Sequence, residues 1–244
     1  MFNKHPKGLI AAALANLGER FGFYTMMAIL VLFLQAKFGM NGKEAGFIYS
    51  TFYFSIYILA LVGGIIADKT RNYKGTIFTG IVLMAVGYLL LAIPSKTPVD
   101  NKMLYLVITC ASLFVIAFGN GLFKGNLQAL VGQMYDNPQY ANMRDSGFSL
   151  FYMFINIGAI FAPFAAVGVR NWWLSTFGYN YDADLPALCH GQLAGTLSPE
   201  ATETYHTLVT KASTAPVQDY TAFASDYLNV FTCLLYTSPS PRDQ

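Results

Sequence analysis

Five long apolar blocks constrain this chain more than any other feature of its sequence. They cover roughly residues 8–36, 45–67, 75–94, 103–123 and 147–169. A hydrocarbon core about 30 Å thick requires roughly 20 consecutive apolar residues in a helix, and each block meets that length. Lipid offers no hydrogen-bond partner to backbone groups, and the short alternating segments of a β-barrel are absent from the sequence. We therefore predict an all-α membrane protein whose residues 1–169 form five transmembrane helices.

The composition supports this prediction and excludes several classes of function. Hydrophobic residues make up 55% of the chain and charged residues 11%, whereas soluble domains carry about 25% charged residues. The net charge is only +2 and no basic tract occurs, so nucleic acid is not an expected partner. The histidines and cysteines show no metal-ligand spacing and no nucleophile motif occurs at membrane depth, so we expect no metal, no cofactor and no enzyme activity.

The remainder of the chain is organised differently. Residues 170–226 are polar and contain no block of spanning length, which predicts an extracytoplasmic loop. Within it, PEATETYHTLVTKA is the one candidate for a short surface helix. Residues 227–232 begin another apolar run, which we interpret as the start of a sixth transmembrane helix.

The last twelve residues, 233–244, have another origin in our interpretation. The string CLLYTSPSPRD fits, in frame, a translation of the transposase adapter used to prepare DNA sequencing libraries. We interpret this tail as an adapter-derived artefact and exclude it from reasoning about the fold. The chain is then expected to be a fragment whose C-terminal half is missing.

Basic residues near the ends of the blocks predict the orientation in the membrane. A dense cluster, Lys69, Arg71 and Lys74, lies between the second and third blocks, while the 170–226 segment is nearly free of positive charge. Cytoplasmic loops carry an excess of Lys and Arg. We therefore expect the N-terminus in the cytoplasm, the 170–226 loop outside, and the plasma (inner) membrane as the location. The first block is too long for a signal peptide and should remain as a span.

A polar stripe crosses the first apolar block. Helical spacing places the following residues on one face: Asn16, Glu19, Arg20, Phe23, Tyr24 and Met27. Gly18 and Gly22 form a small-xxx-small pair, which lets a neighbouring helix approach this span closely. The stripe is therefore expected to face the interior of the bundle.

The adjacent charges Glu19 and Arg20 admit two interpretations. One charge at the bilayer centre costs about 2.5–3.5 kcal/mol even on the lenient insertion scale, so each needs partners. The pair is either a structural ion pair that fixes helix packing or a proton or substrate site beside a water-filled cavity. Lys124, in the string GNGLFKGN of the fourth block, is either a lysine that extends toward the interface or a partner of this pair.

Further polar residues have similar alternatives. Asn156 in the fifth block either cross-links helices by hydrogen bonds or lines the same cavity, and Tyr57 in the second block adds a hydroxyl. In the DKTRNYKG loop, one interpretation of the basic residues is that they set topology alone. Asp68 is also placed to bind the N-terminus of a neighbouring helix, where anions are favoured.

Four motifs in order resemble the proton-dependent oligopeptide transporter family of the major facilitator superfamily. NLGERFGFY resembles its first-helix E-x-x-E-R-F-x-Y-Y, and GGIIADKTRNYKGT resembles its loop between helices two and three. GNGLFKGN resembles its fourth-helix G-x-G-x-x-K-P-N, and FSLFYMFINIGAI its fifth-helix signature. The resemblance covers about 160 residues and implies a major-facilitator-type bundle, of which the chain would contain five helices and the start of a sixth.

The resemblance also implies roles for individual residues. Glu19, Arg20 and Lys124 would couple transport to protons, and Lys124 would bind the substrate carboxylate. The lining of a peptide pocket would include Tyr24, Tyr57, Asn156, Asn16 and Met27. Asp68, Arg71 and Lys74 would form a cytoplasmic gate. The implied partners are a small peptide, protons, the lipid bilayer and the missing C-terminal half.

The sequence departs from the family motifs at several positions. Asn16 replaces the first acid and Met27 the arginine, so the stripe loses one acid and one base. Phe23 replaces a tyrosine, and Ala60 and Gly125 replace prolines. Two alternatives therefore stay open: a major facilitator carrier for another solute with altered or no proton coupling, and a non-transporting membrane sensor or scaffold that uses the 170–226 loop.

Overall fold

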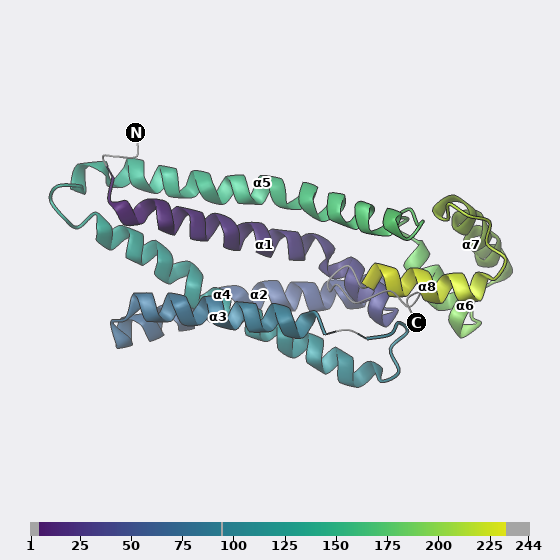
Figure 1. Cartoon of the computed structure of the whole chain (residues 1–244). Helices are drawn as coiled ribbons and strands as arrows, with labels where there is room; N and C mark the ends of the chain where they lie inside the picture. Colours follow the sequence, from purple (N-terminus) through teal and green to yellow (C-terminus); the bar gives the residue numbers. More distant parts are fainter. Residues whose placement is uncertain (1–4, 94, 233–244) are drawn as a thin grey trace. The chain divides into compact units, whose positions relative to one another are not determined.

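The structure, a computed structural model, describes residues 5–93 and 95–232 and is built almost entirely of helices (Figure 1). The helices of these residues are α1 (Lys7–Phe38), α2 (Gly42–Thr70), α3 (Tyr73–Leu91), α4 (Lys102–Met134), α5 (Arg144–Thr176), α6 (Leu185–Ala194), α7 (Pro199–Ala212) and α8 (Tyr220–Thr232). Five of the described helices, α1 to α5, are long and apolar enough to cross a membrane. The predicted all-α membrane fold is confirmed. The proposed adapter-derived tail, 233–244, lies outside the described residues.

Two helices extend well beyond the apolar blocks that predict them. α4 continues to Met134, although its block ends near residue 123, because Lys124 and Asn126 interrupt the apolar run without interrupting the helix. α5 continues to Thr176, so part of the segment expected to be a loop belongs to this helix.

The chain divides into two compact units, and each is described separately. The first unit comprises Met1–Ala28, Ser50–Leu90 and Cys110–Ala165. The second comprises Ile29–Tyr49, Leu91–Thr109 and Ala166–Gln244. All predicted site residues lie in the first unit, and α6 to α8 lie in the second.

Glycines bring α4 close to α2 and α3 in the first unit. A Cβ added to Gly63 of α2 would overlap the Gly121 carbonyl of α4, and one added to Gly80 of α3 would lie 2.7 Å from the Gly119 carbonyl. Real Cβ atoms do not approach backbone this closely, so both contacts require glycine. Gly119 and Gly121, which precede Lys124 in the sequence, therefore permit the tight packing of α4. A Cβ on Gly125 would meet no atom of the described residues within 4 Å.

No described helix packs closely against Gly18 or Gly22. Both are exposed, and a Cβ on either would meet nothing within 4 Å among the described residues. α1 does have a close neighbour, but the small residue is Gly158 on α5, whose Cβ would lie 2.8 Å from the Leu17 carbonyl. A small-xxx-small pattern shows where close packing is possible, and the shape of the partner helix decides where it occurs.

These contacts predict opposite effects for two glycine-to-alanine substitutions. Gly63→Ala forces α2 away from α4, and overpacking of this kind costs about 1–3 kcal/mol. Gly18→Ala adds a methyl group to open space and gains up to about 1 kcal/mol of helix propensity. Thermal unfolding of the purified protein in detergent should show a lower Tm for Gly63→Ala and an unchanged or higher Tm for Gly18→Ala. Equal losses in both variants would contradict the packing described here.

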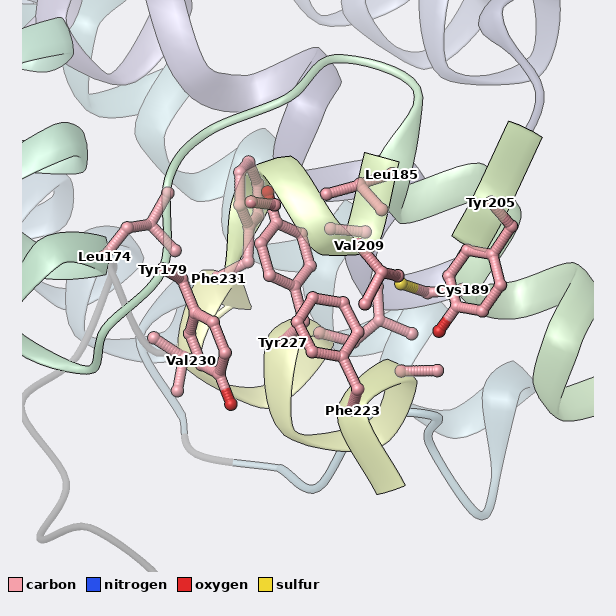
Figure 2. Packing of buried hydrophobic residues seen from close by; sticks show 14 residues of the cluster. Leu174, Tyr179, Leu185, Cys189, Tyr205, Val209, Phe223, Tyr227, Val230 and Phe231 are labelled. Atoms are coloured by element: carbon pink, nitrogen blue, oxygen red, sulfur yellow. The ribbon is translucent and has the colours of Figure 1, made fainter. Parts of the chain in front are cut away.

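The 170–226 segment is a folded part of the second unit, contrary to the loop prediction. α6, α7 and α8 enclose a core rich in aromatic side chains (Figure 2). We call its ring-bearing buried members the aromatic cluster: Tyr179, Tyr205, Phe223, Tyr227 and Phe231. α7 covers the residues of the predicted surface helix, with Tyr205, Val209 and Ala212 turned into the core. These three residues have helical spacing and share one face of α7. The segment is polar on average, so its composition did not reveal that apolar face.

Local sequence signals position these three helices. The Ser198 hydroxyl accepts a hydrogen bond from the Ala201 amide at the start of α7, and Asp219 accepts from the Thr221 amide at the start of α8. Gly195 ends α6 in the left-handed conformation at φ 65°, where glycine has no Cβ to strain. The helices are therefore delimited by ordinary caps that the sequence contains.

Ring contacts and hydrogen bonds hold the second unit together. Tyr179 meets Phe223 edge to face, with ring centroids 5.4 Å apart, and Phe223 stacks on Tyr227 at 5.6 Å. The Trp173 indole of α5 donates to the Val230 carbonyl of α8 at 2.9 Å. Cys189 is fully buried beside Tyr205 (Figure 2). Burial raises the pKa of the Cys189 thiol to about 12, so this thiol is unreactive in the folded unit.

A histidine attaches α6 to the C-terminal end of α1. Nε2 of His190 lies 2.7 Å from the Ala36 carbonyl, one of the last four of α1, which have no partner within the helix. The ring also covers Gly39, whose φ of 62° and missing Cβ leave space for it. Burial lowers the pKa of His190, and the positive charge of Lys102 lowers it further.

The lowered pKa predicts a loss of stability on acidification. The unfolded chain binds a proton near pH 6.5, whereas the folded chain binds it only at lower pH. The His190 contribution is therefore present above pH 6.5 and lost as pH falls through the folded pKa. The drop in Tm between pH 7.5 and pH 5.0 should be smaller in His190→Gln, which keeps a donor without titrating. An equal drop in both proteins would refute this role of His190.

Candidate functional site

The predicted stripe of α1 faces the interior of the first unit. Asn16, Arg20, Phe23 and Met27 are buried, and Glu19 and Tyr24 are partly buried. Arg20 is only 4% exposed, which is rare for an arginine unless it is paired. The expectation that the stripe faces the bundle interior is therefore correct. Because little of Asn16 or Met27 is exposed, contact of either with a substrate stays a prediction.

Glu19 and Arg20 form a bidentate ion pair that a third residue completes. Arg20 donates from Nε to Oε2 of Glu19 at 2.5 Å and from a terminal nitrogen to Oε1 at 2.9 Å. Asn120 of α4 donates its amide to Oε1 at 2.5 Å, and its carbonyl accepts from Arg20 at 3.5 Å. Both carboxylate oxygens and part of the guanidinium are thereby satisfied. The guanidinium also lies 5.2 Å from the centre of the Phe23 ring.

Asn120 is a site residue whose contact with the ion pair the sequence did not predict. It is fully buried and links α1 to α4, and its amide also lies 4.0 Å from the sulfur of Met84 on α3. The signal was present as an asparagine between two glycines in an apolar block. A buried amide needs hydrogen-bond partners, and the flanking glycines let neighbouring helices approach it.

Lys124 lies one turn beyond Asn120 on α4 and is only partly buried. Its Nζ is 5.4 Å from the centre of the Tyr57 ring on α2, within the range of a cation–π contact. Its charge interacts electrostatically with both Glu19 and Arg20. Among the described residues, however, Lys124 makes no ion pair with Glu19 within 4.0 Å. The structure thus places Lys124 beside the ion pair and in contact with an aromatic ring.

Two asparagines differ in what they bind. Asn126 of α4 donates to the Gly63 carbonyl of α2 at 3.1 Å and to the Leu122 carbonyl at 2.8 Å, so it cross-links two helices. Asn156 is exposed on α5 and makes no hydrogen bond within the described ranges. Within the described residues, Asn126 therefore cross-links helices and Asn156 does not. The lining interpretation of Asn156 stays a prediction.

The proposed gate residues lie at the turn between α2 and α3. Asp68 accepts a hydrogen bond from the Tyr73 hydroxyl at 2.6 Å, and Tyr73 is the first residue of α3. Arg71 has a left-handed backbone at φ 51°, which produces the sharp turn between the helices. Within residues 5–93 and 95–232, neither Arg71 nor Lys74 forms an ion pair with Asp68. Asp68 thus contacts the start of α3 through the side chain of Tyr73 and not through the backbone of the helix.

No metal-binding arrangement accompanies these residues. Within the described part of the chain, no three His, Cys, Asp or Glu side chains lie close enough to share a metal ion. The site consists instead of a buried acid–base pair, a bridging amide and a half-buried lysine beside tyrosines. Such a set can bind a proton and an anionic group, because its charges can exchange partners.

The chain is similar to known peptide transporters. Residues 74–189 match the sequence profile of the POT family, PTR2. Peptide transporter YePEPT of Yersinia enterocolitica is 34% identical over 185 residues, which are 74% of this chain and 34% of the relative. Dipeptide and tripeptide permease A of an Enterobacter species is 34% identical over 72% of this chain and 32% of its own length. The uncharacterized transporter YclF of Bacillus subtilis is 32% identical over 80% of this chain.

Solved structures agree with these matches. A mutant of the peptide transporter POT, crystallised in complex with sulfate, superposes with a TM-score of 0.60 and 28% identity, covering 86% of this chain and 45% of that one. Tetrameric PepTSo2 gives a TM-score of 0.60 at 26% identity, covering 94% of this chain and 49% of that one. The fold is therefore that of the solved peptide transporters.

The chain belongs to the POT family, which is a family of transporters and not of enzymes. It spans about a third of the length of the curated relatives it matches. What the whole protein carries is therefore considered below as a proposal.

The network predicts different costs for two asparagine-to-leucine substitutions. Asn120→Leu removes one donor from the Glu19 carboxylate, and a hydrogen bond to a charged group contributes roughly 1.5–3 kcal/mol. Asn156→Leu removes no hydrogen bond and should change stability by less than about 0.5 kcal/mol. The Tm in detergent should fall for Asn120→Leu alone. A similar Tm for both variants would mean that Asn120 does not support the ion pair.

Proposed function

We propose that the full-length protein carrying this chain is a secondary active transporter that couples uptake of di- and tripeptides to protons. The observation that carries the proposal is a buried acid, Glu19, whose partners Arg20 and Asn120 satisfy both of its oxygens, beside the half-buried Lys124. Two relatives named as a peptide transporter and a dipeptide and tripeptide permease support this substrate class.

Protonation of Glu19 is the proposed coupling step. The ionised carboxylate holds Arg20 through two hydrogen bonds. A protonated Glu19 carries no charge, so its attraction for Arg20 and Lys124 falls, and these cations become available to an anion. The substrate carboxylate then binds at Lys124, and the two halves of the protein rock around the loaded site. Coupling follows because the ionised Glu19 and the substrate carboxylate compete for the same cations, and the proton removes Glu19 from that competition.

The remaining predicted residues have supporting functions in this proposal. Tyr24, Tyr57 and Asn156 line the peptide pocket, and Asn16 and Met27 define its α1 side. Asp68, Arg71 and Lys74 form the cytoplasmic gate. The N-terminus lies in the cytoplasm and the protein resides in the plasma (inner) membrane. The second half of the protein supplies the other wall of the pocket.

The coupling proposal predicts separate effects on driven uptake and on exchange. In the full-length protein, Glu19→Gln should abolish uptake driven by a proton gradient, because Gln cannot gain or lose the proton. Exchange of labelled for unlabelled peptide should persist. Glu44→Gln, a matched change at an exposed residue near the start of α2, should leave both rates unchanged. Driven uptake at the parental rate in Glu19→Gln would defeat the proposal.

The substrate proposal predicts the effect of removing the lysine. Lys124→Ala should raise the KM for dipeptides at least tenfold, equivalent to about 1.4 kcal/mol, or abolish transport. The measurement is initial uptake into proteoliposomes over a range of peptide concentrations. An unchanged KM would exclude Lys124 from the carboxylate site.

A carrier for another solute is the second candidate. Asn16 and Met27 remove one acid and one base from the stripe, which leaves fewer groups to bind a proton and a carboxylate together. Competition of unlabelled sugars, nitrate and peptides against uptake of a labelled dipeptide distinguishes the two. Peptide uptake without proton dependence would retain the substrate and reject the coupling.

A further inference from the structure

Tyr53, one turn before Tyr57 on α2, belongs to the arrangement around Lys124. Its hydroxyl accepts a hydrogen bond from the Tyr57 hydroxyl at 3.0 Å, and the two rings meet edge to face with centroids 5.4 Å apart. Residues four apart lie on the same helix face, so the two side chains support each other along α2. The two tyrosines are 42% and 55% exposed, so this face of α2 is accessible in the first unit.

Tyr57 is therefore restrained at two points. Its hydroxyl is held by Tyr53, and its ring lies 5.4 Å from Nζ of Lys124. The hydroxyl oxygen lies on the axis about which the ring rotates, so the hydrogen bond fixes where the ring lies, and the edge-to-face contact with Tyr53 restrains the plane of the ring. The direction of that plane determines where the face, which attracts cations, meets the ammonium group. Lys124 has a long flexible stem and takes its position from such contacts.

We propose that Tyr53 is a positioning residue for the anionic group of the substrate. It acts through Tyr57, whose ring it holds in place, and thereby sets the position of the Lys124 ammonium group. This inference rests on the proposed function, because it assigns the Lys124 side of the same pocket to a carboxylate. Tyr53 does not touch the substrate in this scheme, so its loss changes affinity for the carboxylate and leaves the rate of conformational cycling unchanged.

The test is Tyr53→Phe in the full-length protein. The ring and its packing remain, and only the hydroxyl that accepts from Tyr57 is lost. The KM for a dipeptide with a free carboxylate should rise three- to tenfold with the maximal rate unchanged. The inhibition constant of the matching dipeptide amide, measured by competition, should be the same in parent and variant. A merely structural effect would weaken both ligands or lower the rate.

Two further variants complete the design. Tyr57→Phe removes the other hydroxyl of the pair. The KM of the double variant for the dipeptide should be no higher than that of Tyr57→Phe alone, because both changes break the same hydrogen bond between Tyr57 and Tyr53. Tyr152→Phe is the matched control, since this exposed tyrosine of α5 contacts Phe148 and Phe151 through its ring. It should leave both ligands unaffected.

The outcomes separate this inference from the proposed function. An active parent with an unchanged KM in Tyr53→Phe overturns the inference alone, as does an equal loss for carboxylate and amide. Multiplicative losses in the double variant also overturn it. A parent that takes up no peptide overturns the proposed function, and the inference with it.

Discussion

The burial of two opposite charges on one helix is the constraint on which the first unit depends. Neither Glu19 nor Arg20 is tolerable alone in an apolar bundle, and their pairing is completed by an amide from another helix. The network therefore fixes the rotation of α1 relative to α4 within this unit. In the proposed coupling, a change in the charge of this acid alters the partners of nearby cations. Stability and proposed coupling thus depend on the same hydrogen bonds.

α4 provides both the packing and the chemistry of that unit. Gly119 and Gly121 bring the backbones of α3 and α2 against it, and Asn120 between them reaches α1. One turn later, Lys124 meets the Tyr57 ring. Close backbone packing and a buried polar side chain are compatible here because the glycines leave space for the amide. This explains how a polar group can lie at the centre of the helices without an unsatisfied donor.

The second unit is stabilised differently. Its helices α6 to α8 bury rings against one another, and hydrogen bonds from Trp173 and His190 tie them to α8 and to the end of α1. Composition pointed to a polar loop because the Thr, Ser and Glu residues outnumber the buried rings. The helical spacing of Tyr205, Val209 and Ala212 was readable in the sequence, but a mean over 57 residues, 170–226, concealed it.

The sequence by itself determined the five long helices, the inward-facing stripe of α1 and the resemblance to the POT family, because length, periodicity and motif are properties of the linear order. Only the tertiary structure decided which residues meet. Within the described residues it put Gly158 of α5, and not Gly18 or Gly22, at the close contact of α1, added Asn120 to the ion pair, and set Lys124 beside Tyr57 instead of in an ion pair with Glu19. The physical reason is that a contact depends on the shapes of two helices, and a single helix's pattern specifies only one of them.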